Sequence, residues 1–364
     1  MYDAILTDFP RLCNETDDSP RIQRAIDAAP NGILCIPKGD YRIARPLFIR
    51  NRCSLDMHPA ARLIAVEKMN FVLTYDGNGN FHELTLYDEA GEVYDNLGLF
   101  IRGGDIDGAG LASCLLLENA HHYTLSNISL HNGKTYGLCV GGVMDGRLYE
   151  LVANNVYCKC TMPGLAGNIG ICARQCDLHF TDCFVIDYTI GVRDTGGANR
   201  YTRCHIWGGT VPPVGLTVKE WSVAYAERKK KMREGGYDDA MEAEILACGV
   251  PEMLADSISF ELNGSGNVVD GCYADTASIG YLVRGGSNVI TNSGSFNNKL
   301  MGLRNTVAIK NESSKLIVNN CRFTNATGSD RVYEGKREAL VWHSNFTNDD
   351  SMGDDYFLLR KNEE

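Results

Sequence analysis

Four carboxylates in this 364-residue chain have the spacing to carry out acid–base chemistry: Asp187, Asp194, Glu261 and Asp275. If the chain winds in coils about 4.8 Å apart, the backbones of Asp187 and Asp275 are about 10 Å apart, because two coils separate them. Allowing for side-chain reach, this is compatible with the roughly 6.5–9.5 Å between the carboxyl groups of inverting glycosidases. Asp187 and one of the other three acids are therefore a candidate acid and base for cleaving a glycosidic bond.

The same acids also have structural interpretations. Asp187 could cap backbone N–H groups at a corner of the chain. Glu261 is expected one coil above Arg193, and the two could form a cross-coil ion pair that contributes little at a surface. Asp105 and Asp107 belong to a Gly-Gly-Asp-Ile-Asp-Gly turn and are expected to serve the bend rather than a reaction.

Aromatic and basic residues near these acids are candidates for substrate binding. The sequence places aromatic, cationic and acidic groups at alternating, outward positions of neighbouring coils. Aromatic rings beside polar hydrogen-bonding groups are what a sugar ring requires, although any exposed face of a repeat fold carries mixed polar residues. The candidate binding residues are His131, Lys159, Arg193, His205, Trp207 and Tyr273.

An internal repeat predicts the elements that position these residues. Its equivalent origins, mostly cysteines, are Ile128, Cys183, Cys204, Cys272, Gly294 and Cys321. The residue two places after each origin is apolar, and so are the residues three and twelve places before it, with the sole exception of Thr291. Successive origins lie about 21 to 28 residues apart where no insertion intervenes, which fits one coil of a β-helix.

The repeat predicts an all-β fold, a single right-handed parallel β-helix over residues 1–364. Each coil is expected to hold short strands with alternating inward and outward side chains, joined by corners rich in glycine and asparagine. Leucine-rich repeats need a different leucine pattern, and propeller blades need about 40 residues per unit. The cysteines at four origins are best explained as a stack of small, buried hydrophobic residues.

Three segments depart from the repeat. Residues 15–30 have an acidic or serine start, a proline in the first turn and one apolar face, and predict a helix that caps the N-terminal end. Residues 211–255 contain two helical patterns separated by Gly-Gly, and predict a helical hairpin that shields the candidate site or binds a neighbouring subunit. Residues 340–364 are expected to form a C-terminal cap or tail.

Three motifs resemble those of the pectin-lyase-like superfamily of β-helical carbohydrate-active enzymes. They are Asp-Asp-Ser-x3-Gln-x-Ala-Ile-Asp-Ala-Ala from residue 17, Ile-Pro-Lys-Gly-Asp-Tyr from residue 36 and Gly-Gly-Asp-Ile-Asp-Gly-Ala-Gly from residue 103. The resemblance implies the β-helical fold. It does not assign a reaction, because the superfamily includes hydrolases, lyases, transglycosylases, epimerases and non-catalytic tail fibres. The catalytic motifs of its polygalacturonase-type members do not stand in the corresponding coils.

Three functions are compatible with these residues. The first is a glycoside hydrolase or transglycosylase that acts on an oligosaccharide or polysaccharide through its carboxylates. The second is a polysaccharide lyase, in which Lys159, His131, His205 and Arg193 could supply the base and neutralise a uronate. The third is a non-catalytic β-helix used for adhesion or assembly.

Composition and charge indicate which partners, compartment and cofactors to expect. The formal net charge of −11 has the wrong sign for binding many nucleic-acid phosphates. No apolar run approaches the length of a membrane span, and no signal peptide is recognised at the N-terminus. We therefore expect a cytoplasmic protein whose 14 cysteines are free thiols. Their spacing does not favour zinc, so we expect no metal and no cofactor. A homo-oligomer, for example a trimer, is compatible with the sequence.

Overall fold

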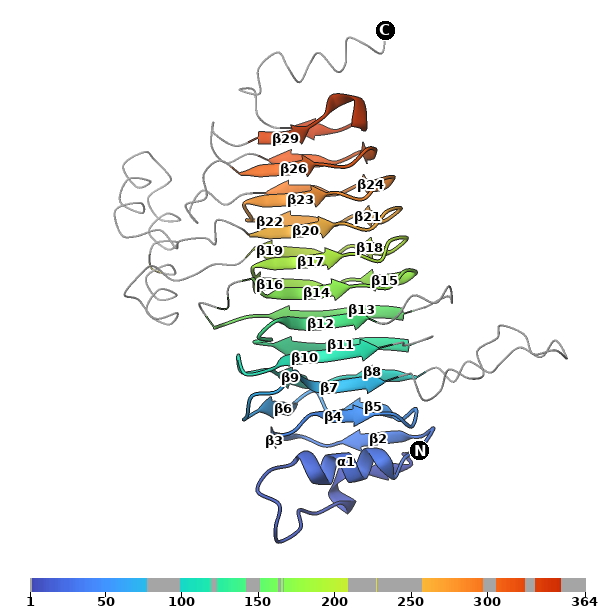
Figure 1. The fold of residues 1–364 in the computed structure, drawn as a ribbon, viewed down its shortest axis with the longest axis vertical. Coiled ribbons are helices and arrows are strands. Elements are labelled where there is room, and N and C mark those ends of the chain that lie inside the picture. The colour runs from blue at the N-terminus through green and yellow to red at the C-terminus, as the bar shows by residue number, and fades with distance from the viewer. Residues whose placement is uncertain are drawn as a thin grey trace, which may run out of the picture.

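The computed structural model describes residues 2–76, 99–118, 123–141, 151–162, 165, 167–208, 227, 257–296, 306–324 and 331–347. In these residues the chain forms a stack of coils, with the short helix α1 at the N-terminal end of the stack (Figure 1). Strands of successive coils pair in parallel throughout. The predicted hairpin at 211–255, except residue 227, and residues 348–364 lie outside the described residues. No helix in the described part is long and apolar enough to cross a membrane.

Each regular coil contributes one strand to each of three parallel sheets. Sheet 1 consists of β4 (Leu47–Ile49), β7 (Phe71–Asp76), β10 (Ser113–Glu118), β12 (Tyr136–Gly141), β14 (Ile169–Ala173), β17 (Ile190–Asp194), β20 (Ile258–Leu262), β23 (Ile279–Val283), β26 (Val307–Asn311) and β29 (Arg331–Gly335). Sheet 2 consists of β1 (Ala4–Ile5), β2 (Ile33–Ile36), β5 (Ser54–Met57), β8 (Phe100–Arg102), the first halves of β11 (Tyr123–His131) and β13 (Leu151–Lys159), β15 (Leu178–Thr181), β18 (Arg200–Thr202), β21 (Val268–Asp270), β24 (Asn288–Thr291), β27 (Leu316–Asn319) and β30 (Leu340–His343).

Sheet 3 follows sheet 2 after a bend in every coil. It consists of β3 (Gly39–Ile43), β6 (Ala61–Ala65), β9 (Asp105–Asp107), the second halves of β11 and β13, β16 (Phe184–Tyr188), β19 (His205–Gly208), β22 (Tyr273–Asp275), β25 (Gly294–Phe296), β28 (Arg322–Thr324) and β31 (Phe346–Thr347). The other elements are α1 (Ser19–Asp27) and the 3-10 turns η1 (Leu6–Asp8) and η4 (Arg337–Ala339).

The bend between sheets 2 and 3 explains the asparagine-rich corners. From β11 onward, one residue of each bend has a positive φ, a conformation that Gly, Asn and Asp tolerate best. In two of these bends Asn155 donates from Nδ2 to Asn127 at 2.8 Å, and Asn320 donates to Asn292 at 2.6 Å. Asparagine therefore supports the left-handed backbone and also links successive coils.

The interior agrees with the predicted apolar columns. Ring stacking continues from coil to coil, as between Phe180 and Tyr201, whose centroids are 5.1 Å apart. Cys183, Cys204 and Cys272 occupy successive inward positions, and the described cysteines are all free. The expected stack of buried free thiols is therefore confirmed for these three coils.

The register corrects the predicted repeat in one coil. The pairing of β22, β25 and β28 aligns Ser293, rather than Gly294, with the cysteine origins. Ile290, which is fully buried, then replaces Thr291 in the apolar column, so the apparent exception disappears. The outward positions of this coil become Gly294 and Phe296. A one-residue slip turns every side chain of a strand to the opposite face, and the sequence-based assignment contained such a slip.

Helix α1 contacts β4, the edge strand of sheet 1. The Gln23 amide donates to the Phe48 carbonyl at 2.8 Å and accepts the Phe48 N–H at 2.9 Å, as a neighbouring strand would. Ser19 accepts backbone N–H groups of residues 44 and 45. The Ser and Gln of the first motif thus both bind backbone groups of the chain that follows the helix.

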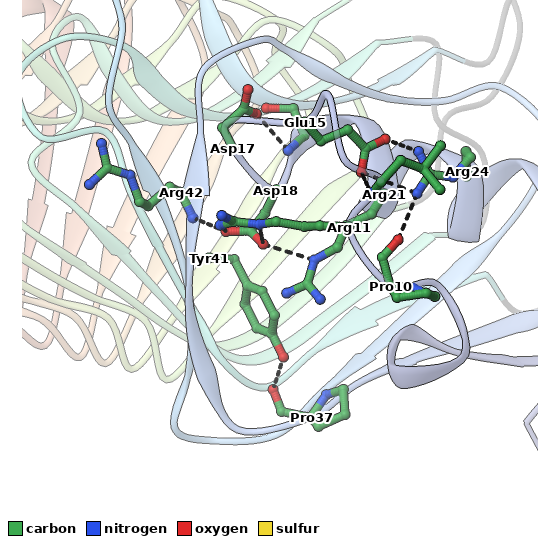
Figure 2. A network of polar contacts seen from close by, with 12 residues as sticks. Pro10, Arg11, Glu15, Asp17, Asp18, Arg21, Arg24, Pro37, Tyr41 and Arg42 are labelled. Atoms are coloured by element: carbon green, nitrogen blue, oxygen red, sulfur yellow. Dashed lines mark hydrogen bonds and ion pairs between the residues drawn. The ribbon is translucent and has the colours of Figure 1, made fainter.

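A charged network surrounds the start of α1, and Figure 2 shows it from close by. The buried Asp18 carboxylate accepts hydrogen bonds from the Arg11 guanidinium at 2.9 and 2.6 Å and from the Arg42 N–H at 2.7 Å. Burial opposes the charged form, but these bonds and the charge of Arg21 hold the pKa of Asp18 below its ordinary value. The network links the segment before α1 to β3.

Candidate active site

The outer face of sheet 3 carries a row of ring-bearing side chains. One coil apart, Tyr157, Phe184, His205 and Tyr273 stand in register, and we call them the aromatic row. Their successive ring centroids are 6.4, 5.9 and 5.2 Å apart. Phe184 is 37% exposed and Tyr273 38% exposed, although large aromatic side chains are usually buried. This exposed row is a surface on which rings of a ligand can stack.

An imidazole and a carboxylate meet beside the aromatic row. His205 Nε2 lies 3.2 Å from Asp275 Oδ2, and Thr276 Oγ1 donates to Asp275 Oδ1 at 2.6 Å. The Asp275 side chain is 12% exposed and the His205 side chain 35% exposed. Burial, followed by the charge of Asp275, raises the pKa of the neighbouring Tyr273. An oriented acid–imidazole pair at the edge of solvent can transfer protons.

Asp187 and Trp207 complete this part of the face. Asp187 has a φ of +61° and lies at an irregularity of strand pairing between residues 186 and 188. It lies two coils before Asp275, so their backbones are about 10 Å apart. Trp207 is half-buried and pairs directly with Asp275; its Nε1–H is buried without a hydrogen-bond partner among the described residues. The structure thus brings His205, Trp207, Tyr273 and Asp275 to one face, and Asp187 lies at the irregularity one coil before His205.

Asp194 does not belong to that face. Its side chain is fully buried inside the coils, where it accepts hydrogen bonds from Tyr201 Oη and Asn199 Nδ2, each at 2.7 Å, and from the Gly197 N–H at 3.1 Å. Burial raises the pKa of Asp194. The prediction that it lines the cleft is wrong, because strand alternation turns Asp194 inward when Val192 points inward.

Glu261 and Arg193 lie on the outer face of sheet 1, away from the sheet 3 row. Glu261 accepts from Arg193 Nε and from Arg284 Nη1, each at 2.5 Å. Burial opposes ionisation, but these arginines lower the pKa of Glu261. The structural interpretation as a cross-coil ion pair therefore holds, and the predicted cleft surrounded by all four acids does not form.

A second polar cluster lies further along the sheet 3 face. His131 Nδ1 is 2.7 Å from Asp105 Oδ1, and Arg62 donates to both Asp105 and Asp107 at 3.2 Å. Lys159 pairs with His131 on the next coil and makes no ion pair with a described residue. Asp105 and Asp107 were expected to serve the turn alone. Their place in the same outward rows as Ser129 and His131 was the available signal for this cluster.

Two further observations concern a ring that the sequence did not assign and the possibility of a metal site. Phe296 stacks against Tyr273 with centroids 6.5 Å apart, so the slipped register had concealed one ring of this face. Among the described residues, no group of three or more His, Cys, Asp or Glu side chains is arranged to hold a metal ion.

Comparison with known proteins supports the fold. No protein-family model and no curated protein matches the sequence. An endo-xylogalacturonan hydrolase from Aspergillus tubingensis is 11% identical, with a TM-score of 0.59 over 94% of this chain and 92% of the other. The ORF18 protein of Geobacillus virus E2 is 14% identical, with a TM-score of 0.60 over 94% of this chain and 60% of the other. The tailspike of E. coli bacteriophage HK620, solved with a pentasaccharide, is 10% identical, with a TM-score of 0.59 over 94% and 62%.

The chain thus has the right-handed parallel β-helix fold of pectin-lyase-like proteins, as the sequence motifs implied. It spans about three fifths of the length of the viral protein and of the tailspike. At these identities the likeness concerns the fold alone.

Proposed function

We propose that this protein is a carbohydrate-active enzyme that binds a saccharide along the aromatic row and cleaves or transfers a glycosidic bond near Asp275. The observation that carries the proposal is the exposed aromatic row directly beside the His205–Asp275 pair. Rings for stacking and groups for proton transfer therefore share one surface. The hydrolase and the pentasaccharide-bound tailspike among the similar structures support a saccharide ligand.

Asp275 and Asp187 are the proposed acid and base. Asp275 is mostly buried and held by His205 and Thr276, so its orientation is defined. Asp187 lies two coils away, which leaves about 10 Å between backbones for a sugar residue and a water or acceptor hydroxyl. One carboxyl group would protonate the leaving oxygen while the other activates the nucleophile.

A lyase reaction is the second candidate, favoured by the cluster at His131. Asp105 holds the His131 ring through Nδ1, which leaves Nε2 to act as a base. Lys159 on the next coil supplies a cation that could neutralise a uronate carboxylate. This cluster is three coils, or about 14 Å, from His205, so the two candidate reactions use different residues.

The test is a panel of neutral and acidic oligosaccharides, with products read by mass spectrometry. A product heavier by one water supports hydrolysis, and a transferred sugar supports transglycosylation. On the substrate found, Asp275→Asn and Asp187→Asn should each lower kcat by about 100-fold or more. The control is Asp182→Asn, which removes only an exposed ion pair with Arg203.

The outcomes separate the alternatives. An unsaturated, ultraviolet-absorbing product that disappears in His131→Gln would favour the lyase. Near-normal turnover of both Asp275→Asn and Asp187→Asn would place the active site elsewhere. Binding without any product would support the non-catalytic use in adhesion or assembly.

A further inference from the structure

Two cysteines stand side by side on the outer face of sheet 1, a different sheet from the one that carries the aromatic row. Cys139 in β12 and Cys172 in β14 are direct partners in the parallel register. They are 1% and 2% exposed and pack with Ile169 and Ile190 in a small apolar cluster separate from the main core. Unlike the cysteines at the repeat origins, they lie outside the coil interior.

Cationic side chains accompany this pair. The Arg174 guanidinium donates to Tyr136 Oη at 2.7 Å and lies 5.3 Å from the Tyr136 ring centroid. Arg193 is the direct strand partner of Cys172 on the next coil. The hydrogen bond between the two thiols, together with these two arginines, lowers the pKa of Cys172 although burial opposes this, and the same bond and burial raise the pKa of Cys139. Of the two thiols, Cys172 is therefore the one whose thiolate the arginines favour.

The interior cysteines provide an internal comparison. Cys183 and Cys204 are also neighbours on successive coils, and both are buried. The hydrogen bond with Cys204 and burial raise the pKa of Cys183 well above its ordinary value. The two pairs thus have the same coil spacing and similar burial, but arginines lower a thiol pKa only at Cys139 and Cys172, and reactivity follows the thiolate.

We propose that Cys139 and Cys172 form a redox modification site, a dithiol that a small peroxide oxidises to a disulfide. The Cα atoms of direct partners on neighbouring strands are about 4.8 Å apart, within the roughly 4.4–6.8 Å range of disulfides. No large movement of the backbone is therefore needed to join them. This inference is independent of the proposed carbohydrate chemistry.

The reaction takes place in two balanced steps. The Cys172 thiolate attacks one oxygen of hydrogen peroxide, the O–O bond breaks, and Cys172 becomes a sulfenic acid as hydroxide leaves. The Cys139 sulfur then attacks the Cys172 sulfur, the S–O bond breaks, and hydroxide leaves. The proton of the Cys139 thiol and one from solvent convert the two hydroxides to water. Two thiols lose two electrons in total, and the peroxide is reduced to two waters.

The test uses the full-length protein treated with hydrogen peroxide under native conditions and then alkylated. Mass spectrometry of non-reduced peptides should show a link between Cys139 and Cys172 that dithiothreitol reverses. Its formation should be at least about tenfold faster than any oxidation of Cys183 and Cys204, because Arg174 and Arg193 favour the thiolate of Cys172, whereas burial and the neighbouring thiol disfavour that of Cys183. Cys139→Ser should trap the sulfenic acid, detected as a dimedone adduct on Cys172.

Matched variants test the electrostatic cause. Arg174→Met should slow the oxidation, Arg174→Lys should restore part of the rate, and Cys204→Ser should leave the rate unchanged. Circular dichroism verifies that each variant is folded. The comparison of oxidation rates between the two cysteine pairs is made in the wild-type protein and needs no variant. Equal rates for the two pairs, or sulfenic acid at Cys172 without a link to Cys139 in the wild type, would overturn the proposal.

Discussion

At the scale of single residues, surroundings divide the acids of this chain into two groups. Asp275 is held by a histidine and a threonine on a face that carries partly exposed rings. Asp194 is enclosed by three hydrogen-bond donors inside the coil, and Glu261 is enclosed by two arginines on another sheet. An acid that must reach a substrate needs an accessible oxygen, whereas Asp194 is fully buried and both oxygens of Glu261 bind arginines. We therefore assign Asp194 and Glu261 to stability.

Replacing Asp194 tests that assignment. Asp194→Ala removes the acceptor for Tyr201, Asn199 and Gly197 and leaves buried donors unsatisfied, which should lower the free energy of unfolding by about 1–3 kcal/mol or more. Turnover, measured well below the melting temperature on a verified substrate, should stay near the wild-type value. A folded Asp194→Ala protein with a 100-fold lower kcat would return Asp194 to the active site.

The contribution of Glu261 to the free energy of unfolding should depend on pH. Its folded-state pKa is below the ordinary 4.5, so its stabilising effect is present above the unfolded-state pKa and is lost as pH falls through the folded-state pKa. Glu261→Gln should lower the free energy of unfolding by about 1–3 kcal/mol at pH 7. The difference from wild type should shrink steadily in urea titrations below pH 4.5.

The exposed Glu312, which also bonds Arg284, provides the control for Glu261. Glu312→Gln should change stability less at pH 7, because water already solvates its carboxylate. An effect of Glu261→Gln that is the same at all pH values would show that charge is not the cause.

The sequence predicted in part which acids are enclosed and which lie on the sheet 3 face. Strand alternation in Ile190-Gly-Val-Arg-Asp194 implies that Asp194 faces inward once Val192 does. The sequence therefore contained the signal that Asp194 is buried. By contrast, two of the donors that enclose Asp194, the Gly197 N–H and Asn199 Nδ2, come from the turn before β18, whose path no periodicity specifies. His205, Trp207, Tyr273 and Asp275 were correctly expected on one face because they occupy equivalent positions of adjacent coils.

At the scale of elements, the ends of the sheets need partners that the repeat cannot supply. The edge strand β4 has unpaired backbone groups toward the N-terminal end, and such edges promote association with other strands. Gln23 in α1 bonds both the N–H and the C=O of Phe48. One side-chain amide therefore substitutes for one residue of a further strand.

Replacing Gln23 measures this contact. Gln23→Ala should lower the free energy of unfolding by about 1–3 kcal/mol, since two backbone groups lose their partners, while the helix propensity of alanine offsets only a small part. Asp27→Ala, which removes a bond to the same side chain at an exposed position, should have little effect. Equal melting temperatures for Gln23→Ala and wild type would mean that water satisfies the edge equally well.

The sequence predicted the repeating coil correctly but placed one strand in the wrong register. Apolar columns identified the coil, since each inward position stacks on its neighbours. The error at Gly294 arose because glycine and serine are both small, so neither marked the inward position, and only the alignment with Ile290 distinguishes the two registers. The sequence did not reveal where each coil bends from sheet 2 to sheet 3, because from β11 onward the bend is a single residue with positive φ, and β11 and β13 run through it without a break.

At the scale of the whole molecule, a β-helix turns a repeat into a linear surface. Each coil contacts mainly its neighbours, so equivalent outward positions line up along the axis. The aromatic row spans three coil intervals from Tyr157 to Tyr273, or about 14 Å, and Phe296 extends the rings by one more interval. A ligand that uses all of these rings must be extended and must lie along the axis.

This geometry predicts that affinity depends on ligand length. Oligosaccharides of increasing length should bind more tightly until they span about 19 Å, the four intervals from Tyr157 to Phe296, and longer chains should gain little more. Tyr157→Ala, at the end of the row remote from Asp275, should weaken binding of long ligands by about 1–3 kcal/mol per stacked ring lost, by analogy with base stacking. For the shortest oligosaccharide that is cleaved, Tyr157→Ala should change neither KM nor kcat.

Val152→Ala, an exposed residue of sheet 2, should change neither quantity for any length and serves as the control. Calorimetry on a series of defined oligosaccharides provides the affinities. If Tyr157→Ala weakened short and long ligands equally, the saccharide would cross the row instead of following it. The acid pair would then have to be sought on either side of the row, and not along it.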